Sequence, residues 1–332
     1  MAEEKFLVVR LGSLGDIVHT LPAAAALRES FPNKKMVWLT HGRWRSLVEA
    51  ANLTDEIWEL DTRSPGSIRT VRKRIRREGF SVAIDYQGLW KSASLPFLAG
   101  VPRRIGFSLK DAREFGVSFL YTDKVNVSGV HVAEKNGELS LRAGARKPLG
   151  EFSLTVPEKS QQAASSMLRS KGIKEYVVLS PGGGWISKCW PAERFGQLAL
   201  RLEQEFGMKS VINCGPGEEA LAERVVAAAG DAKPISHSGE IGDMMALLKG
   251  ARCVVAGDTG PLHLADALGT KVVAIFGPTD PARNGPFLAR KTVLRAKNVE
   301  STYKRRDSPH PSLLEISVGD VVDAMAEAGV LR

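Results

Sequence analysis

The chain has 332 residues, 43% of them hydrophobic, which is sufficient for two α/β domains with separate cores. Its net charge is +9, and residues 1–150 carry 24 basic against 16 acidic side chains, so an acidic partner is expected for one domain only. The cysteines lie far apart, which argues against a structural metal. The N-terminus is acidic and enters a strand, which argues against a signal peptide. No uncharged apolar run approaches the roughly 18 residues of a membrane span. A cytoplasmic protein is therefore expected, soluble or at most peripheral to a membrane.

The first half alternates apolar runs with amphipathic stretches. Helices are expected at about residues 23–30, 44–51, 67–78 and 91–98, and strands at Phe6–Arg10, Lys35–Leu39, Glu56–Leu60 and Val82–Asp85, with shorter ones near Arg104–Gly106 and Tyr121. Alternation of this length predicts a parallel, doubly wound sheet. A polar stretch at Ala143–Lys159 is interpreted as a linker.

The first strand leads into a glycine-containing loop, Gly12–Pro22. Its spacing fits neither the dinucleotide-binding G-x-G-x-x-G pattern nor a Walker A loop. In one interpretation the glycines make a tight turn, Asp16 caps a helix and His19 is structural. In the other, the loop lines an active site and Asp16 is a general base that takes a proton from an attacking hydroxyl.

Two further polar segments fall in the basic half. Asp85–Ala93 reads D-Y-Q-G-L-W-K-S-A, and Asp111–Glu114 reads D-A-R-E. Such clusters are ordinarily helix caps with a solvated lysine, but Lys91 and Arg113 could instead bind carboxylates or phosphates.

A basic helix is expected within Arg69–Arg77, with Ile68, Val71 and Ile75 on its other face. A solvated surface helix is the default interpretation, and docking onto anionic lipid headgroups is the alternative. No nucleic-acid partner is expected, because no aromatic residues interleave the cations and no nucleic-acid fold motif is present.

The second half repeats the alternation. Helices are expected at about residues 191–206, 218–229 and 244–248 and at the C-terminus near Gly329, and strands at Tyr176–Ser180, Ser210–Asn213, Cys253–Ala256 and Lys271–Phe276. Three domains or segments follow: residues 1–155, residues 156–315, and a C-terminal helix within 316–332 for which packing back on the N-terminal domain is an option.

Loops after these strands carry the candidate phosphate chemistry. Gly183, Gly184 and Lys188 follow one strand, and Glu218 follows the next. Taken alone, the lysine would be solvated and the glutamate would be a helix-start acid favoured by the helix dipole.

The stretch Val254–Pro281 predicts strand, tight turn, helix and strand, because Pro261 fits the first turn of a helix. Free N–H groups at such a helix start favour an anion, typically a phosphate. An ordinary βα loop with Asp258 as a turn residue is the alternative.

Taken together, D-T-G-P-L-H at Asp258–His263, G-D-I-V-H-T-L-P at Gly15–Pro22, K-C-W-P at Lys188–Pro191 and the Asp85–Ala93 element resemble glycosyltransferase family 9, and within it the heptosyltransferase I subfamily. The resemblance implies the glycosyltransferase B fold, with two Rossmann-like α/β domains facing a cleft. The N-terminal domain would bind the acceptor and the C-terminal domain the nucleotide-sugar donor.

The resemblance also implies residue roles. Asp16 would be the catalytic base, and the acceptor would be held by Ser13, Gly15, Lys91 and Arg113. The donor would be held by Gly183, Gly184, Lys188, Glu218, Gly239, Asp258, Thr259, Gly260 and His263. Hydroxyl residues common in the family are replaced here by Gly183 and Gly184, and the cysteines often found near residues 300–312 are replaced by Tyr303–Arg306.

The implied reaction is inverting transfer of L-glycero-D-manno-heptose from ADP-heptose to the Kdo of a lipid A precursor, an anionic glycolipid. No D-x-D signature is present, so no cofactor or metal is expected, and a monomer is expected. Alternatives are another family 9 transferase, such as heptosyltransferase II or one that uses a different sugar, a sugar-nucleotide epimerase, or a non-catalytic protein that binds nucleotide sugar or anionic lipid.

Overall fold

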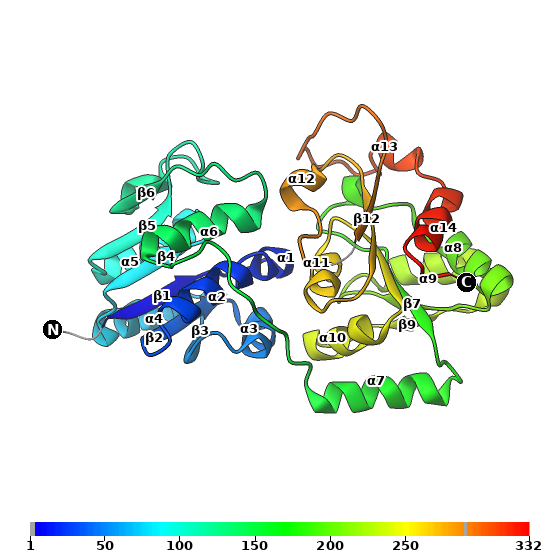
Figure 1. Ribbon diagram of the computed structural model, residues 1–332, viewed down its shortest axis with the longest axis horizontal. Helices are drawn as coiled ribbons and strands as arrows, with labels where there is room; N and C mark the ends of the chain where they lie inside the picture. Colours follow the sequence, from blue (N-terminus) through cyan, green and yellow to red (C-terminus); the bar gives the residue numbers. More distant parts are fainter. Residues whose placement is uncertain (1–3, 289–290, 332) are drawn as a thin grey trace. The chain divides into compact units, whose positions relative to one another are not determined.

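The computed structural model describes residues 4–288 and 291–331, and the chain divides into two compact units, Met1–Thr155 and Val156–Arg332. Each unit is built on one six-stranded sheet with helices packed against it (Figure 1). Every strand pairing is parallel. The α/β class with two Rossmann-like domains, predicted from the sequence, is confirmed.

The first sheet has the strand order β3-β2-β1-β4-β5-β6. Its strands are β1 (Lys5–Val9), β2 (Lys35–Thr40), β3 (Glu56–Glu59), β4 (Val82–Asp85), β5 (Arg103–Phe107) and β6 (Asp123–Val125). The middle strand β1 is buried throughout Phe6–Val9, as expected for a strand covered by helices on both faces.

The helices of this unit are α1 (Leu14–Val18), α2 (Leu21–Ser30), α3 (Arg45–Ala51), α4 (Pro65–Glu78), α5 (Trp90–Ala99) and α6 (Val132–Ala143), with 3-10 turns η1 (Gly42–Trp44) and η2 (Val117–Leu120). Helix α4 begins where the Ser64 hydroxyl accepts from the Ser67 amide, and ends at Gly79 in the left-handed region. Val71 and Ile75, one turn apart, bury its inner face in the core that also holds β1, β2 and part of α5.

The second sheet has the order β12-β11-β10-β7-β8-β9. Its strands are β7 (Tyr176–Ser180), β8 (Lys209–Asn213), β9 (Ile235–His237), β10 (Cys253–Gly257), β11 (Val272–Phe276) and β12 (Lys291–Arg295). Its larger helices are α7 (Glu158–Ser170), α8 (Ala192–Phe206), α9 (Glu219–Ala228), α10 (Ile241–Gly250), α11 (Gly260–Ala267) and α14 (Val318–Glu327), and its short elements are α12 (Pro281–Asn284), α13 (Pro311–Leu314), η3 (Ile186–Lys188) and η4 (Gly230–Ala232).

Helix α14 lies in the core of the second unit. Val321 and Met325 are fully buried in the same cluster as Phe195 of α8. Helix α14 contacts α8, β11 and β12 of its own unit, and the packing of residues 316–332 on the N-terminal domain stays a prediction.

Two of the longer helices, α6 and α7, were not expected from the sequence. Helix α6 turns Asn136, Gly137 and Ser140 toward the interior, so it lacks the apolar periodicity that signals a helix. Helix α7 buries only Ala164 and lies partly in the stretch expected to be a linker. The strand expected near Tyr121 is β6, which begins two residues later because Tyr121 ends the 3-10 turn η2.

No helix of the described ranges is both long and apolar enough to cross a membrane.

Candidate active-site residues in each unit

The strand order of the first sheet reverses between β1 and β4, which pair side by side. In open parallel sheets, ligands bind beyond the carboxyl ends of the strands at such a switch point. The chain leaves β1 toward Arg10–Asp16 and leaves β4 toward Tyr86–Gly88, so these two segments form the candidate site of the first unit.

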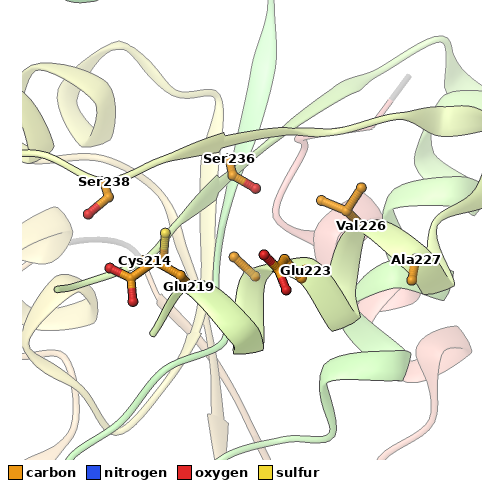
Figure 2. A pocket seen from close by; sticks show the side chains of 8 residues that line it. Cys214, Glu219, Glu223, Val226, Ala227, Ser236 and Ser238 are labelled. Carbon is orange, nitrogen blue, oxygen red and sulfur yellow. The ribbon is translucent and has the colours of Figure 1, made fainter. Parts of the chain in front are cut away.

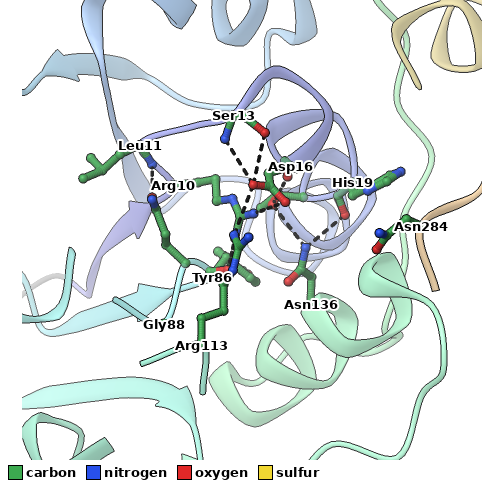
Figure 3. A network of polar contacts seen from close by, with 12 residues as sticks. Arg10, Leu11, Ser13, Asp16, His19, Tyr86, Gly88, Arg113, Asn136 and Asn284 are labelled. Carbon is green, nitrogen blue, oxygen red and sulfur yellow. Dashed lines mark hydrogen bonds and ion pairs between the residues drawn. The ribbon is translucent and has the colours of Figure 1, made fainter. Parts of the chain in front are cut away.

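Asp16 lies in α1 at the centre of a polar network (Figure 3). Its Oδ1 is 2.7 Å from Nη2 of Arg10, and its Oδ2 is 3.2 Å from Nη1 of Arg113. The amide and the hydroxyl of Ser13 both donate to Oδ2 at 3.2 Å. The carboxylate is thus held from several sides, and its side chain remains 23% exposed.

Burial would raise the pKa of Asp16, but the charges of Arg10 and Arg113 outweigh it and hold the pKa well below its ordinary value. Asp16 is therefore a carboxylate at neutral pH. Its two partners differ, because the side chain of Arg10 is buried whereas that of Arg113 is half exposed. Only Arg113 can leave the carboxylate without stranding a charge in the interior.

The loop around Asp16 is fixed by residues next to it. Arg10 donates through Nη1 to the carbonyl of Tyr86, and the amide of Leu11 donates to Oε1 of Gln87 at 2.7 Å. At Gly12, φ is +151°, and a Cβ there would lie 2.6 Å from Nε1 of Trp44. Only glycine fits this position.

Asp85 supports the same loop from β4. Its Oδ1 accepts from the amide of Gln87 at 2.9 Å, and its Oδ2 accepts from the hydroxyls of Ser92 at 2.8 Å and Tyr121 at 2.7 Å. Burial raises the pKa of Asp85, although these hydrogen bonds oppose that effect. Three members of the 85–93 element therefore serve as scaffold beneath the loop.

The predicted acceptor residues separate into two groups. Ser13 and Arg113 contact the Asp16 carboxylate, and Gly15 is buried in α1, where its carbonyl accepts from the His19 amide. Lys91 is exposed on α5, and the ion pairs of Asp16 within the described ranges do not include it. His19 itself is buried, and its ring lies 4.9 Å from that of His131.

In the second sheet the order reverses between β7 and β10. The loops that leave these two strands contain Gly183–Lys188 and Asp258–Gly260. The same topological rule therefore predicts that these loops form the candidate site of the second unit.

Lys188, Asp258 and His263 form a buried group in these loops. Nζ of Lys188 is 3.6 Å from Oδ2 of Asp258, and Nε2 of His263 is 3.4 Å from Oδ1. Burial would raise the pKa of Asp258, but the hydrogen bond with His263 and the charge of Lys188 lower it to about 2. Nζ of Lys188 also lies 4.3 Å from the ring centroid of Trp185, a cation–π contact.

Thr259 precedes the first turn of α11, which Gly260 and Pro261 begin. The Thr259 hydroxyl is buried and has no hydrogen-bond partner among the residues that the structure describes, and it does not cap the helix. A buried polar atom of this kind requires an explanation. A hydroxyl, an ammonium group and a helix N-terminus together can hold an anion such as a phosphate.

The glycines after β7 lie against this group. A Cβ on Gly183 would be 2.7 Å from Sγ of Cys189 and 3.5 Å from Cγ2 of Thr259, and one on Gly184 would be 3.9 Å from Cε of Lys188. The structure thus brings Gly183, Gly184, Lys188 and Thr259 together.

Glu218 and Gly239 lie in other loops of the same unit. Oε2 of Glu218 accepts from the amide of Gly215 at 2.7 Å, and its carboxylate lies against Gly182, where a Cβ would overlap it. This places Glu218 beside the loop after β7. Gly239 is packed against His237 and Asp243.

Two arginines near the candidate sites were not identified from the sequence as site residues. Arg10 had a recognisable signal, because an arginine that ends an apolar strand needs a buried partner. Arg305 lies 5.5 Å from the ring centroid of Trp185 and had no such signal.

The tail around Arg305 is joined to the loop after β7 at Ser187. The hydroxyl of Ser187 donates to the Lys304 carbonyl at 3.3 Å, and the amide of His310 donates to the Ser187 carbonyl at 3.1 Å. A segment more than a hundred residues downstream is therefore tied to the residue directly before Lys188.

Two other features of the described chain bear on ligands. No group of three or more His, Cys, Asp or Glu side chains lies together there as metal ligands would. A cavity of about 450 Å³ lies between α9 and β9, lined by residues that include Cys214, Glu219 and Ser236 (Figure 2). It shares no lining residue with the Lys188–Asp258 group.

Residues 68–313 match the family model described as glycosyltransferase family 9 (heptosyltransferase). The chain is 27% identical to lipopolysaccharide heptosyltransferase 1 of Pseudomonas aeruginosa over 85% of this chain and 81% of that protein. Among solved structures it resembles the Escherichia coli heptosyltransferase WaaC with ADP, with a TM-score of 0.75, 26% identity and coverage of 98% and 99%. It also resembles E. coli ADP-heptose LPS heptosyltransferase II, with a TM-score of 0.81, 20% identity and coverage of 97% and 98%.

Proposed function

This chain belongs to glycosyltransferase family 9 and is a glycosyl-transfer enzyme, and we propose that it moves L-glycero-D-manno-heptose from ADP-heptose to the Kdo of a lipid A precursor. The names of its relatives support a place in lipopolysaccharide core synthesis. The cytoplasmic face of the inner membrane is the location that we propose for this step. Family membership removes the alternative of a non-catalytic binding protein.

The observation that carries the proposal is the partly exposed carboxylate of Asp16, paired with Arg10 and Arg113 at the switch point of the first unit. In the proposed reaction, Asp16 accepts the proton of the acceptor hydroxyl while that oxygen attacks the anomeric carbon. The bond from the anomeric carbon to the diphosphate oxygen breaks, its electron pair leaves with ADP, and the anomeric centre is inverted.

A carboxylate held between two guanidinium groups is a weak base. Asp16 would become a stronger base if the exposed Arg113 moved away from it. An acceptor with carboxylates of its own would attract the exposed guanidinium of Arg113 away from Oδ2 of Asp16. Loss of that positive charge raises the pKa of Asp16, because one of the charges that lowered it has moved. Acceptor binding would thus make Asp16 a stronger base just before the acceptor hydroxyl loses its proton.

The departing diphosphate needs positive charge, and the group around Lys188 would supply it. Lys188, the buried hydroxyl of Thr259 and the N-terminus of α11 would bind the phosphates, with Asp258 and His263 holding Lys188 in place. Glu218 would accept from the ribose hydroxyls, and Gly239 would lie near the adenine, as the family resemblance implies. We propose that this charge neutralisation operates without a metal ion.

The test is product analysis after the protein is mixed with ADP-heptose and either Kdo2-lipid A or the same acceptor already carrying one heptose. Heptosylation of Kdo2-lipid A that persists in EDTA is expected. Transfer only to the heptosylated acceptor would instead support the second candidate, a heptosyltransferase II. Loss of activity in EDTA that returns with added metal would contradict the metal-free mechanism.

A further inference from the structure

Large apolar side chains are exposed together on the first unit. Phe115 and Phe119 are 84% and 68% exposed, and Trp90, Phe97 and Leu98 of α5 are also exposed. Monomeric proteins rarely expose such a group without a use for it. We define the aromatic patch as Trp90, Phe97, Leu98, Phe115 and Phe119.

The members of the patch are contiguous. Nε1 of Trp90 donates to the Phe115 carbonyl at 3.2 Å. The rings of Trp90 and Phe119 both lie beside Gly116, 3.4 and 4.0 Å from where a Cβ on that glycine would lie. Trp90 and Phe97 are two turns apart on α5, and therefore lie on one face of that helix.

Positive charge surrounds the patch. The guanidinium of Arg104 lies 5.3 Å from the ring centroid of Phe97, and Nζ of Lys124 lies 5.3 Å from that of Phe119. Lys91 is exposed beside Trp90. Helix α4 packs beside α5 on the same core and exposes six further cations. Arg74 is paired with Glu56, and the other five are Arg69, Arg72, Lys73, Arg76 and Arg77.

The patch also adjoins the candidate site. Arg113, which contacts Asp16, and Phe115, which belongs to the patch, are two residues apart in one loop. That loop is anchored where the Glu114 amide donates to the Gly88 carbonyl and the Glu114 carboxylate accepts from the Trp90 amide.

We propose that the aromatic patch inserts into the interfacial region of an anionic lipid bilayer, with the surrounding cations on the lipid headgroups. Aromatic rings with adjacent cations are suited to this region of the bilayer. The rings bury their apolar surface between the headgroups and the acyl chains, and the cations pair with the anionic headgroups. Helix α4 then adds long-range attraction to the insertion. The orientation rests on the proposed function, because a lipid-anchored acceptor would reach Asp16 from the membrane beside Phe115.

The experiment uses the full chain and vesicles of phosphatidylethanolamine with or without phosphatidylglycerol, containing no acceptor. We expect the wild type to sediment with the phosphatidylglycerol vesicles, and the Phe115→Ser/Phe119→Ser variant to bind at least about tenfold more weakly. The matched control is Leu141→Ser/Leu314→Ser, which removes two exposed apolar side chains on α6 and α13 and should bind like the wild type. Brominated lipids should quench the tryptophan fluorescence of the wild type more strongly than that of the Trp90→Phe variant, because Trp90 belongs to the aromatic patch.

Transfer to a deacylated, water-soluble acceptor separates this proposal from the proposed function. The Phe115→Ser/Phe119→Ser variant should keep that activity and lose transfer to vesicle-bound acceptor. Vesicle binding without transfer to any acceptor would sink the proposed function and still support the docking surface. The docking proposal is overturned if the wild type does not bind, if the variant binds equally well, or if the variant instead converts a wild-type dimer to a monomer.

Discussion

The two units have the same strand topology but use it differently. Each places an aspartate after a central strand at its switch point, Asp16 in one and Asp258 in the other, and each aspartate is paired with two basic side chains. The Asp16 side chain is 23% exposed with one exposed partner, whereas that of Asp258 is 8% exposed with both partners buried. Exposure, not topology, separates a carboxylate suited to proton transfer from one suited to holding a cation.

The strongest test of this comparison is Asp16→Asn. If Asp16 is the base, turnover should fall by about 10²–10⁴-fold, because the amide cannot accept the proton. ADP affinity, measured by calorimetry, should stay unchanged, since the substitution lies in the other unit. A fall in turnover of less than about threefold would show that Asp16 is not the base.

Lys188→Ala tests the other half of the comparison. Removing the ammonium group should weaken ADP binding by about 10–100-fold, as expected for loss of a charge-assisted contact to phosphate. Lys209→Ala, which removes an exposed lysine of the same unit, is the matched control and should bind ADP normally. Equal ADP affinity in all three proteins would remove Lys188 from the donor site.

Arg10 and Arg113 sharpen the contrast between a buried and an exposed partner of the same carboxylate. Arg10→Met should lower the free energy of unfolding by about 3 kcal/mol, because it breaks a buried pair and strands the carbonyl of Tyr86. Arg113→Met should cost less than about 1 kcal/mol and act mainly on the KM for the acceptor. Denaturant unfolding and steady-state kinetics check both, and equal destabilisation would contradict the distinction.

The pH dependence of stability tests the pairing of Asp258. The pKa of Asp258 falls from an ordinary 3.8 to about 2 on folding, so its ion pairs stabilise the protein above pH ~4 and cease to do so as pH falls toward 2. The contribution is about 2 kcal/mol at neutral pH. The wild type should therefore lose its advantage over Asp258→Asn between pH ~4 and ~2, measured by urea unfolding. A constant difference across that range would contradict the assigned pairing.

The sequence predicted the fold class because the central strands are unbroken apolar runs. Strands such as β1 and β10 are buried on both faces, and the glycine or proline that follows each marks its end. Helices α6 and α7 escaped prediction because their interior positions hold small or polar residues, and only the arrangement of neighbouring segments makes those positions buried.

Prediction of the candidate site had a different limit. Motifs pointed to Asp16, Lys188 and Asp258, but which groups surround each of them depends on contacts between distant segments. Arg113 reaches Asp16 across 97 positions of sequence, a contact that no local pattern specifies. The same applies to Asp85, whose scaffold role follows from Tyr121.

Lys304 and His310, in the tail of the second unit, are hydrogen-bonded to Ser187 in the 3-10 turn η3. These two hydrogen bonds hold the turn that ends at Lys188, and the residues between Lys304 and His310 are largely exposed. A protease cut near Arg305–Asp307 would therefore loosen the turn that ends at Lys188 and leave the side chains of Lys188 and Asp258 chemically unchanged.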